Sequence, residues 1–328
     1  MVEAAILPYD DGRLYLVCSA GERADLAEGA MPEGAIRLVG RWSHDEGDSW
    51  LEPFVVRECE GVPNVMEPSF VRLPGGRVLQ AYMQRDTYEP GGDPVGGMYP
   101  MITCSDDECS TWSEPARITG KKTSCFTTND RLVRLSTGRI ILPVLTAPDM
   151  TDMRVWLSDD DGMSWRSGKG KARAAENDRC GYPVVTELAD GTVAMFMLPS
   201  SGCVQIAHSH DGGDTWTLVN RSGPEPCPAT YIVRRIPDSA DLLLIWNNHT
   251  QRTNLTSAIS RDHGATWSNY RLLEAQQGWP IRHRYAFPGL TFLNDCAHMT
   301  WYERKPHPES EARFDLIYRR LPVRWFYD

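Results

Sequence analysis

The segment Ser158-Asp159-Asp160-Asp161-Gly162-Met163-Ser164-Trp165 decides how the rest of the chain is interpreted, because its pattern returns along the sequence. The pattern is Ser-x-Asp-x-Gly-x-Ser/Thr-Trp, and we call it the Asp box. Its copies start at Ser43, Ser105, Ser158, Ser209 and Ser260, and only the second departs from it, with Cys109 in the place of glycine. A pattern repeated at intervals of about 50 residues indicates a repeat architecture.

Each Asp box predicts a tight turn between two strands, because an Asp carboxylate accepts N–H groups of its own loop and glycine adopts the left-handed conformation. A second series of turns lies upstream of the boxes and separates short apolar runs that are typical of strands. These turns are Asp10-Asp11-Gly12, Pro74-Gly75-Gly76, Ser136-Thr137-Gly138, Ala189-Asp190-Gly191, Pro237-Asp238-Ser239-Ala240-Asp241 and Asn294-Asp295. No segment has the pattern of a long amphipathic helix.

A period near 50 residues fits a four-stranded propeller blade better than a helical repeat of about 34 residues. We therefore expect an all-β, six-bladed β-propeller that occupies residues 1–328 as a single domain. Five blades carry an Asp box, and the sixth, from about Ala286, closes the ring without one. We expect the N-terminal strand and Val323-Arg324-Trp325-Phe326 to pair near each other and seal that ring.

Composition excludes several classes of protein. With 41% hydrophobic and 24% charged residues, the 328-residue chain can build a core, and it has no apolar run as long as a membrane span. A net charge of −10 argues against a nucleic-acid partner. The nine cysteines include no Cys-x-x-Cys pair, so we expect free thiols and neither a metal site nor a cofactor. Without a leader pattern we expect a cytoplasmic protein, or a periplasmic or secreted one if a leader was removed.

Three further segments carry a family resemblance. They are Glu67-Pro68-Ser69-Phe70, Asn129-Asp130-Arg131 and the run from Arg252 to Asp262. Together with the boxes, they make the chain resemble the sialidase superfamily, and in particular its compact bacterial BNR-repeat branch. The resemblance implies that the boxes are structural and lie away from the active site. It places the active site at the N-terminal ends of the innermost strands and in the loops between the second and third strands of each blade.

That geometry selects candidate residues at two kinds of position. The inner-strand starts are Glu67, Asn129, Asp130, Arg131, Tyr182, Tyr231, Arg282, His283, Arg284 and Tyr285. The loops contribute Glu22, Arg23, Arg85, Asp86, Asp149, Asp152, Asn247, Asn248, His249, Arg252, Tyr302, Glu303 and Arg304. Guanidinium groups bind a sugar carboxylate bidentately, so Arg131, Arg252 and Arg284 are the first candidates for that contact and Arg85 and Arg304 the next. Asn129 and His249 are further candidates for binding the substrate.

Glycoside hydrolysis needs a group that protonates the leaving oxygen and a nucleophile or base on the other face of the sugar. The resemblance implies a tyrosine nucleophile, Tyr285 or Tyr302, helped by Glu67 or Glu303. Asp130 is a candidate acid/base, with a salt bridge that orients Arg131 as its alternative role. His249 and His283 are alternative acids.

We expect an exo-acting glycoside hydrolase, similar to an exo-α-sialidase, that releases a terminal acidic sugar from a glycan. One departure from the sialidase pattern matters, because Glu3-Ala4-Ala5-Ile6-Leu7-Pro8 stands where sialidases have the first arginine of their triad. Alternatives are therefore a non-catalytic glycan-binding propeller, a polysaccharide lyase that uses a Tyr/His pair on the same fold, and a protein-interaction propeller. The sequence predicts neither the sugar and its linkage nor the oligomeric state.

Overall fold

The structure is a computed structural model that describes residues 2–21, 36–59, 62, 64–86, 97–121, 123–147, 151–174, 179–217, 219–276, 283–307 and 310–328. These residues form β-strands and a single 3-10 turn. We divide the strands into six groups in chain order. Group 1 holds β1 (Val2–Pro8), β2 (Leu14–Gly21), β3 (Ile36–Ser43) and β4 (Phe54–Arg57). Group 2 holds β5 (Asn64–Arg72), β6 (Val78–Arg85), β7 (Met98–Ser105) and β8 (Ala116–Arg117).

The remaining groups follow the same order. Group 3 holds β9 (Cys125–Phe126), β10 (Val133–Arg134), β11 (Ile140–Thr146), β12 (Asp152–Ser158), β13 (Arg166–Ser167) and β14 (Ala172–Arg173). Group 4 holds β15 (Cys180–Glu187), β16 (Val193–Pro199), β17 (Gln205–Ser209) and β18 (Asn220–Arg221). Group 5 holds β19 (Ile232–Arg235), β20 (Leu242–Asn247), β21 (Asn254–Ser260) and β22 (Ser268–Ala275). Group 6 holds β23 (Arg284–Leu293), β24 (Cys296–His307) and β25 (Ser310–Pro322), and the 3-10 turn η2 (Val323–Phe326) follows it.

Within each group the strands pair antiparallel, and the hydrogen bonds of the described strands define five sheets rather than the expected six. Groups 3 to 6 are four separate sheets, whereas groups 1 and 2 are joined into one sheet of eight strands. The join is one parallel pair between Ile36 on β3 and Asn64 on β5. The all-β, propeller-like fold is thus confirmed, but the prediction of six separate sheets is not.

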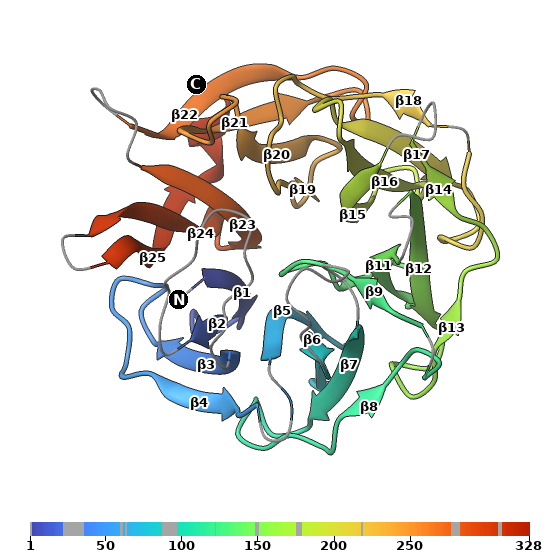
Figure 1. The fold of residues 1–328 in the computed structure, drawn as a ribbon, viewed down its shortest axis with the longest axis vertical. Helices are drawn as coiled ribbons and strands as arrows, with labels where there is room; N and C mark the ends of the chain where they lie inside the picture. The colour runs from blue at the N-terminus through green and yellow to red at the C-terminus, as the bar shows by residue number, and fades with distance from the viewer. Residues whose placement is uncertain are drawn as a thin grey trace.

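The groups stand around a common centre, as Figure 1 shows, with β1, β5, β9, β15, β19 and β23 nearest to it. Hydrophobic cores fill the spaces between neighbouring groups, because both faces of each sheet are covered. Val65 and Phe70 of group 2 pack with Tyr15 of group 1, for example. Ile6 and Leu16 of group 1 are buried in a cluster that also includes Leu316 and Tyr318 of group 6, so the first and last groups lie side by side.

The Asp boxes form the turns that the sequence predicts. In the third box, the Ser158 hydroxyl donates to Asp160 Oδ1 at 2.9 Å and accepts the Gly162 N–H at 2.9 Å. The Asp160 carboxylate also accepts the N–H and the hydroxyl of Ser164, at 2.8 and 2.5 Å. The other four boxes repeat these contacts, including the second, where Cys109 N donates to Ser105 Oγ at 2.9 Å. The boxes therefore close the turns that follow β3, β7, β12, β17 and β21.

Ring closure differs from the prediction. β1 pairs only with β2 among the described strands, and Val323–Phe326 forms η2 instead of a strand. η2 is fixed to group 5, where Asn269 Nδ2 donates to the Tyr327 carbonyl at 2.8 Å and the Arg271 guanidinium lies 4.1 Å from the Trp325 ring centroid. Side chains rather than strand pairing join group 1 to group 6.

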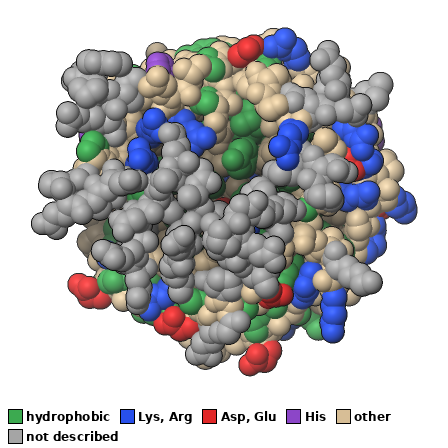
Figure 2. Space-filling model, in the orientation of Figure 1, with side chains coloured by type: hydrophobic (Ala, Val, Ile, Leu, Met, Phe, Trp, Pro, Cys, Tyr) green, Lys and Arg blue, Asp and Glu red, His purple; other side chains and the backbone are tan. Residues whose placement is uncertain are grey.

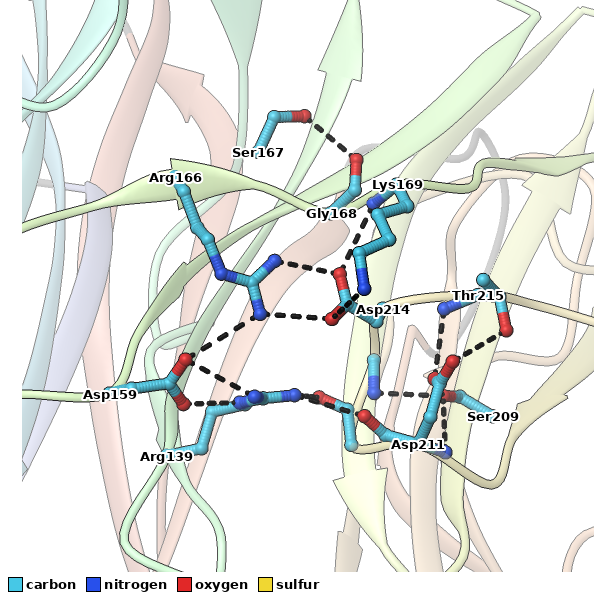
Figure 3. A network of polar contacts seen from close by, with 12 residues as sticks. Arg139, Asp159, Arg166, Ser167, Gly168, Lys169, Ser209, Asp211, Asp214 and Thr215 are labelled. Carbon is cyan, nitrogen blue, oxygen red and sulfur yellow. Dashed lines mark hydrogen bonds and ion pairs between the residues drawn. The ribbon is translucent and has the colours of Figure 1, made fainter.

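Ion pairs connect neighbouring groups close to the boxes, as Figure 3 shows for groups 3 and 4. Arg166 contacts Asp214 at 2.7 Å and Asp159 at 3.5 Å. Arg139 contacts Asp159 at 2.6 Å and donates to the Asp211 carbonyl at 2.9 Å. Asp214 is largely buried and accepts a further hydrogen bond from Lys169 N at 3.3 Å. The two groups are thus bonded to each other by polar as well as apolar contacts.

Two expectations about composition can be compared with the structure. All nine cysteines lie in its described part, where none forms a disulfide, and six of them are buried. Among the described residues, no helix has the length and hydrophobicity needed to cross a bilayer.

Candidate functional site

Four of the inner strands share an irregularity near their first residues. Register shifts fall between Val2 and Ala4 in β1, Met66 and Ser69 in β5, Gly181 and Val184 in β15, and Ala286 and Gly289 in β23. At these bulges Glu3, Glu67, Tyr182 and Phe287 have left-handed φ angles of 50°, 58°, 54° and 54°. Left-handed backbone in residues other than glycine is uncommon and clusters at functional sites, and bulges redirect a side chain. One non-glycine side chain from each of these strands is therefore held at the centre.

Two of these side chains form a carboxyl pair. Glu67 is 2% exposed, and its Oε2 accepts the Asn129 N–H at 2.6 Å. The Glu67 N–H donates to the Ser19 hydroxyl oxygen at 3.1 Å. Burial raises the pKa of Glu3 to about 7. Burial and the nearby Glu3 carboxyl raise the pKa of Glu67 well above its usual value.

A phenol and a guanidinium lie beside the pair. Tyr302 on β24 is half-buried, with its ring stacked on Phe287 at 5.6 Å and edge-on to Phe314 at 5.4 Å. Burial raises the pKa of Tyr302, the charge of Arg252 lowers it, and the Glu3 carboxyl raises it. Tyr182 interacts with the same groups. Burial raises the pKa of Tyr182, the charge of Arg252 lowers it, and the Glu67 and Glu3 carboxyls raise it. Glu3, Glu67, Tyr182, Tyr302 and Arg252 thus act on one another electrostatically, and we call them the central cluster.

Asn129, Asp130 and Arg131 lie at the centre as predicted, but their side chains bond to the protein. Asn129 Nδ2 donates to the Ala4 carbonyl at 2.6 Å. Asp130 accepts the Leu290 N–H at 2.9 Å and pairs with Arg234 at 3.2 Å, so its salt bridge is not with Arg131.

Arg131 is fully buried, and its guanidinium donates to the carbonyls of Asn129 and Tyr231 at 2.9 and 2.7 Å. Burial lowers the pKa of Arg131 to about 10. This geometry holds inner strands together and presents no guanidinium to a ligand.

Tyr285 and Glu303 form a second cluster on the same edge of group 6. They face each other across the β23–β24 pair. Glu303 contacts His283 Nδ1 at 2.6 Å and Lys305 Nζ at 3.7 Å. Burial, Glu303 and Glu274 raise the pKa of Tyr285 to about 12. This tyrosine therefore lies among carboxylates, which disfavour its ionisation, whereas Tyr302 lies beside a guanidinium.

The other predicted arginines and His249 occupy three places. Arg284 on β23 is directly opposite Arg304 on β24. Two residues further along β23, Ala286 is opposite Tyr302. Arg85, at the end of β6, is 2% exposed. His249 lies in the β20–β21 turn, where its carbonyl accepts the Arg252 N–H at 2.9 Å. Figure 2 shows both basic and acidic side chains exposed around this face.

Sequence reasoning missed the role of Glu3 and did not connect Tyr182 with Tyr302. A usable signal existed, because Glu67, Tyr182 and Phe287 each precede a proline, and proline has no N–H to lose at a bulge. Four candidates, Glu22, Arg23, Asp149 and Arg282, lie outside the described residues.

The fold and the central cluster define the class, an all-β propeller-like protein with polar groups at the axial ends of its inner strands. A family model described as a BNR repeat-like domain matches residues 26–299, so the chain belongs to the BNR repeat-like family. The predicted resemblance to the BNR branch of the sialidase superfamily is confirmed.

Solved structures agree with this assignment at the level of the fold. A protein of unknown function from Dyadobacter fermentans has a TM-score of 0.76 at 18% identity, over 97% of this chain and 93% of that one. The K499G mutant of NanB sialidase from Streptococcus pneumoniae has a TM-score of 0.74 at 14% identity, over 98% of this chain and 68% of that one. The intramolecular trans-sialidase from Ruminococcus gnavus has a TM-score of 0.71 at 14% identity, over 98% and 94%.

Proposed function

We propose that this protein is an exo-acting glycoside hydrolase of the sialidase type, which releases a terminal acidic sugar from a glycan without a metal or cofactor. The observation that carries the proposal is the Tyr302 phenol, which lies between two aromatic rings and interacts with Arg252 and Glu3. A phenol is neutral until it reacts, so it does not repel the carboxylate of an acidic sugar as an anionic nucleophile would.

Tyr302 is the better nucleophile of the two predicted tyrosines. Arg252 favours the phenolate of Tyr302, which burial and Glu3 oppose, whereas burial, Glu303 and Glu274 all oppose the phenolate of Tyr285. We expect Arg284 and Arg304, which are opposite each other on β23 and β24, to bind the sugar carboxylate together with Arg252. The buried Arg131 is left out of this set, and Asp130 supports the inner strands.

We also propose that the six strand groups are the six blades of one propeller, with groups 1 and 2 as two blades that touch through one parallel pair. Two observations support this proposal. A hydrophobic core lies between groups 1 and 2, and another hydrophobic cluster contains residues of both group 1 and group 6.

Release of a coloured aglycone from aryl glycosides tests the activity. The panel contains sialic acid, other ulosonic acids, uronic acids and arabinose, the last as a neutral control. We expect turnover of at least one acidic glycoside, lost by about 100-fold or more in Tyr302→Phe and changed by less than about threefold in Tyr285→Phe. Tyr270→Phe, at an exposed tyrosine, is the surface control. A folded chain that turns over none of the acidic glycosides would contradict the proposal.

A glycan-binding module without activity is the second candidate. Glu3 stands where sialidases have an arginine, and Arg131 is bonded to carbonyl groups. Binding of an acidic glycan in calorimetry that is weakened by Arg252→Ala, with no turnover in wild type, would favour this candidate.

A further inference from the structure

A cavity of about 380 Å³ lies between groups 1 and 6, away from the central cluster. Its volume is in the range of small-molecule sites, which is about 300–1,000 Å³. Leu16 and Cys18 on β2 and Leu316 on β25 line the cavity and also belong to the hydrophobic cluster that joins the two groups. The remaining lining residues are Arg41, Trp50, Phe314, Asp315 and Tyr318. The cavity is therefore a hollow in the contact between the first and last groups.

Three aromatic rings form walls of this cavity. Trp50, Phe314 and Tyr318 are half-buried, so their rings are partly accessible to solvent. Trp50 lies edge-on to Tyr318, with ring centroids 5.1 Å apart. The Tyr318 hydroxyl donates to the Glu46 carbonyl at 2.9 Å and contacts His298 Nδ1 at 2.8 Å. Because the polar end of Tyr318 is occupied, its ring is the part that it offers to a ligand, and the three rings together suit a flat apolar group.

Arg41 supplies the positive charge of the cavity. It is directly opposite Leu16 in the β2–β3 pair, so both side chains lie on the face of the sheet that is turned to group 6. The Arg41 side chain is half-buried and makes no hydrogen bond or ion pair with any residue that the structure describes. A guanidinium binds a carboxylate through two parallel hydrogen bonds. Arg41 is therefore available to pair with the carboxylate of a ligand.

Asp315 is the acidic residue among those that line the cavity, and its charge is already balanced. Its carboxylate contacts Lys305 Nζ at 2.5 Å and Arg313 Nε at 2.7 Å. Two cations on one carboxylate leave no net negative charge at this wall to repel an anion. The cavity as a whole is positive and suits a ligand with one negative charge.

We propose that the cavity between groups 1 and 6 binds a small amphipathic carboxylate, whose flat apolar body lies against the three rings and whose carboxylate pairs with Arg41. Burial of the apolar body supplies affinity, and the guanidinium selects acids over neutral molecules of the same shape. None of the lining residues belongs to the central cluster. The site is thus independent of the proposed hydrolase activity.

Isothermal titration calorimetry of the whole chain with three probes tests the site. Phenylacetate has the ring and the charge, phenylacetamide has the same shape without the charge, and acetate has the charge without the ring. We expect one phenylacetate to bind per chain, phenylacetamide to bind about 10-fold or more weakly, and acetate to give no measurable heat. A wild type that binds no phenylacetate, or that binds phenylacetamide equally well, would overturn the proposal.

Variants place the bound carboxylate. Arg41→Gln should weaken phenylacetate binding by about 10-fold or more and change phenylacetamide binding by less than about twofold. This variant should fold, because Arg41 has no partner to lose. The matched control is Arg37→Gln, on the same strand but paired with Glu58 at 3.3 Å, which should change neither affinity.

The central cluster is the other place where a carboxylate could bind, and Arg252→Ala tests it. We expect this variant to bind phenylacetate as wild type does. Weaker binding in Arg252→Ala, with no change in Arg41→Gln, would place the carboxylate at the central cluster and refute the proposal. Turnover of aryl glycosides decides on the hydrolase function separately, whichever result the calorimetry gives.

Discussion

Single residues at the centre of the molecule show what burial does to polar side chains. Arg131 and Glu67 are both fully enclosed, yet they differ in what surrounds them. Arg131 bonds the two terminal nitrogens of its guanidinium to backbone carbonyls. Glu67 accepts one backbone N–H, from Asn129, and burial raises its pKa well above its usual value although the Arg131 charge lowers it. The first arrangement joins inner strands, and the second favours the uncharged form of a carboxyl.

An ion pair far from the centre gives the first stability prediction at this scale. Arg166 and the Lys169 N–H hold the pKa of Asp214 at about 2. A carboxyl whose pKa is lower in the folded than in the unfolded chain stabilises the fold above the unfolded pKa, near 3.9, and this contribution is lost as the pH falls through about 2. Asp214→Asn should therefore cost about 1 to 2 kcal/mol at pH 7 and almost nothing at pH 2.

Urea unfolding at both pH values measures this difference. The matched control is Asp106→Asn, which removes the partner of Arg77 from an exposed pair 2.7 Å apart and should lose much less stability. Equal losses in the two variants at pH 7 would refute the importance of burial for the Asp214 pair.

Strands and turns show how far sequence reasoning reached. The boxes predicted the turns because the Ser, Asp and Gly contacts are local, within four residues of each other. The short strands expected on either side of the turn Pro74-Gly75-Gly76 are also observed, as β5 and β6. It failed for the joined sheet, for η2 and for the Glu3–Glu67 pair, because these depend on contacts between segments far apart in the chain.

The glycines of the boxes also allow close packing between neighbouring groups, which the local sequence does not show. A methyl group at Gly264 would come within 2.8 Å of Phe196 in group 4, and one at Gly162 would overlap Leu79 in group 2. In the second box, Cys109 is left-handed at φ 67°, and its Sγ lies 3.3 Å from the Tyr9 hydroxyl of group 1. The turn glycine is therefore also where one group packs closely on the preceding one.

This packing predicts a difference between two left-handed glycines. Gly264 and Gly76 have φ of 89° and 88°, but a methyl group at Gly76 would meet no described atom within 4 Å. Gly76→Ala should cost about 1 kcal/mol for the backbone alone. Gly264→Ala should cost about 1 to 3 kcal/mol more, because Phe196 is fully buried and has no room to move.

Chemical unfolding of both variants measures the two costs. The same loss in both would mean that the box glycine is needed only for its φ angle and that the contact with the preceding group contributes nothing.

On the scale of the whole molecule, the first and last groups meet in contacts that no covalent bond reinforces. Tyr318 on β25 donates its hydroxyl to the Glu46 carbonyl at 2.9 Å. Arg320 contacts the Glu46 and Asp48 carboxylates at 3.2 and 2.8 Å. Asn294 Nδ2 donates to Glu46 Oε1 at 2.7 Å. The first Asp box is thus the place where the two ends of the chain are joined.

Removal of Arg320 should loosen this junction before the rest of the molecule. In Arg320→Ala we expect amide hydrogen exchange in β3 and β25 to accelerate by about 5- to 30-fold, with little change in β16 and β20. Arg139→Ala, at the junction of groups 3 and 4, should instead affect β12 and β17. Mass spectrometry of peptides from each group measures the pattern, and uniform acceleration in all groups would refute a separable junction.

The bulges at the starts of the inner strands have a consequence for protein engineering. Glu3, Glu67, Tyr182 and Phe287 each lie at a bulge. In each strand, the residues on either side of the bulge are paired with the neighbouring strand. New specificities could accordingly be sampled by randomising these four codons together, with the scaffold held constant. Position 67 would tolerate the fewest replacements, because Glu67 is 2% exposed and its carboxylate accepts the Asn129 N–H.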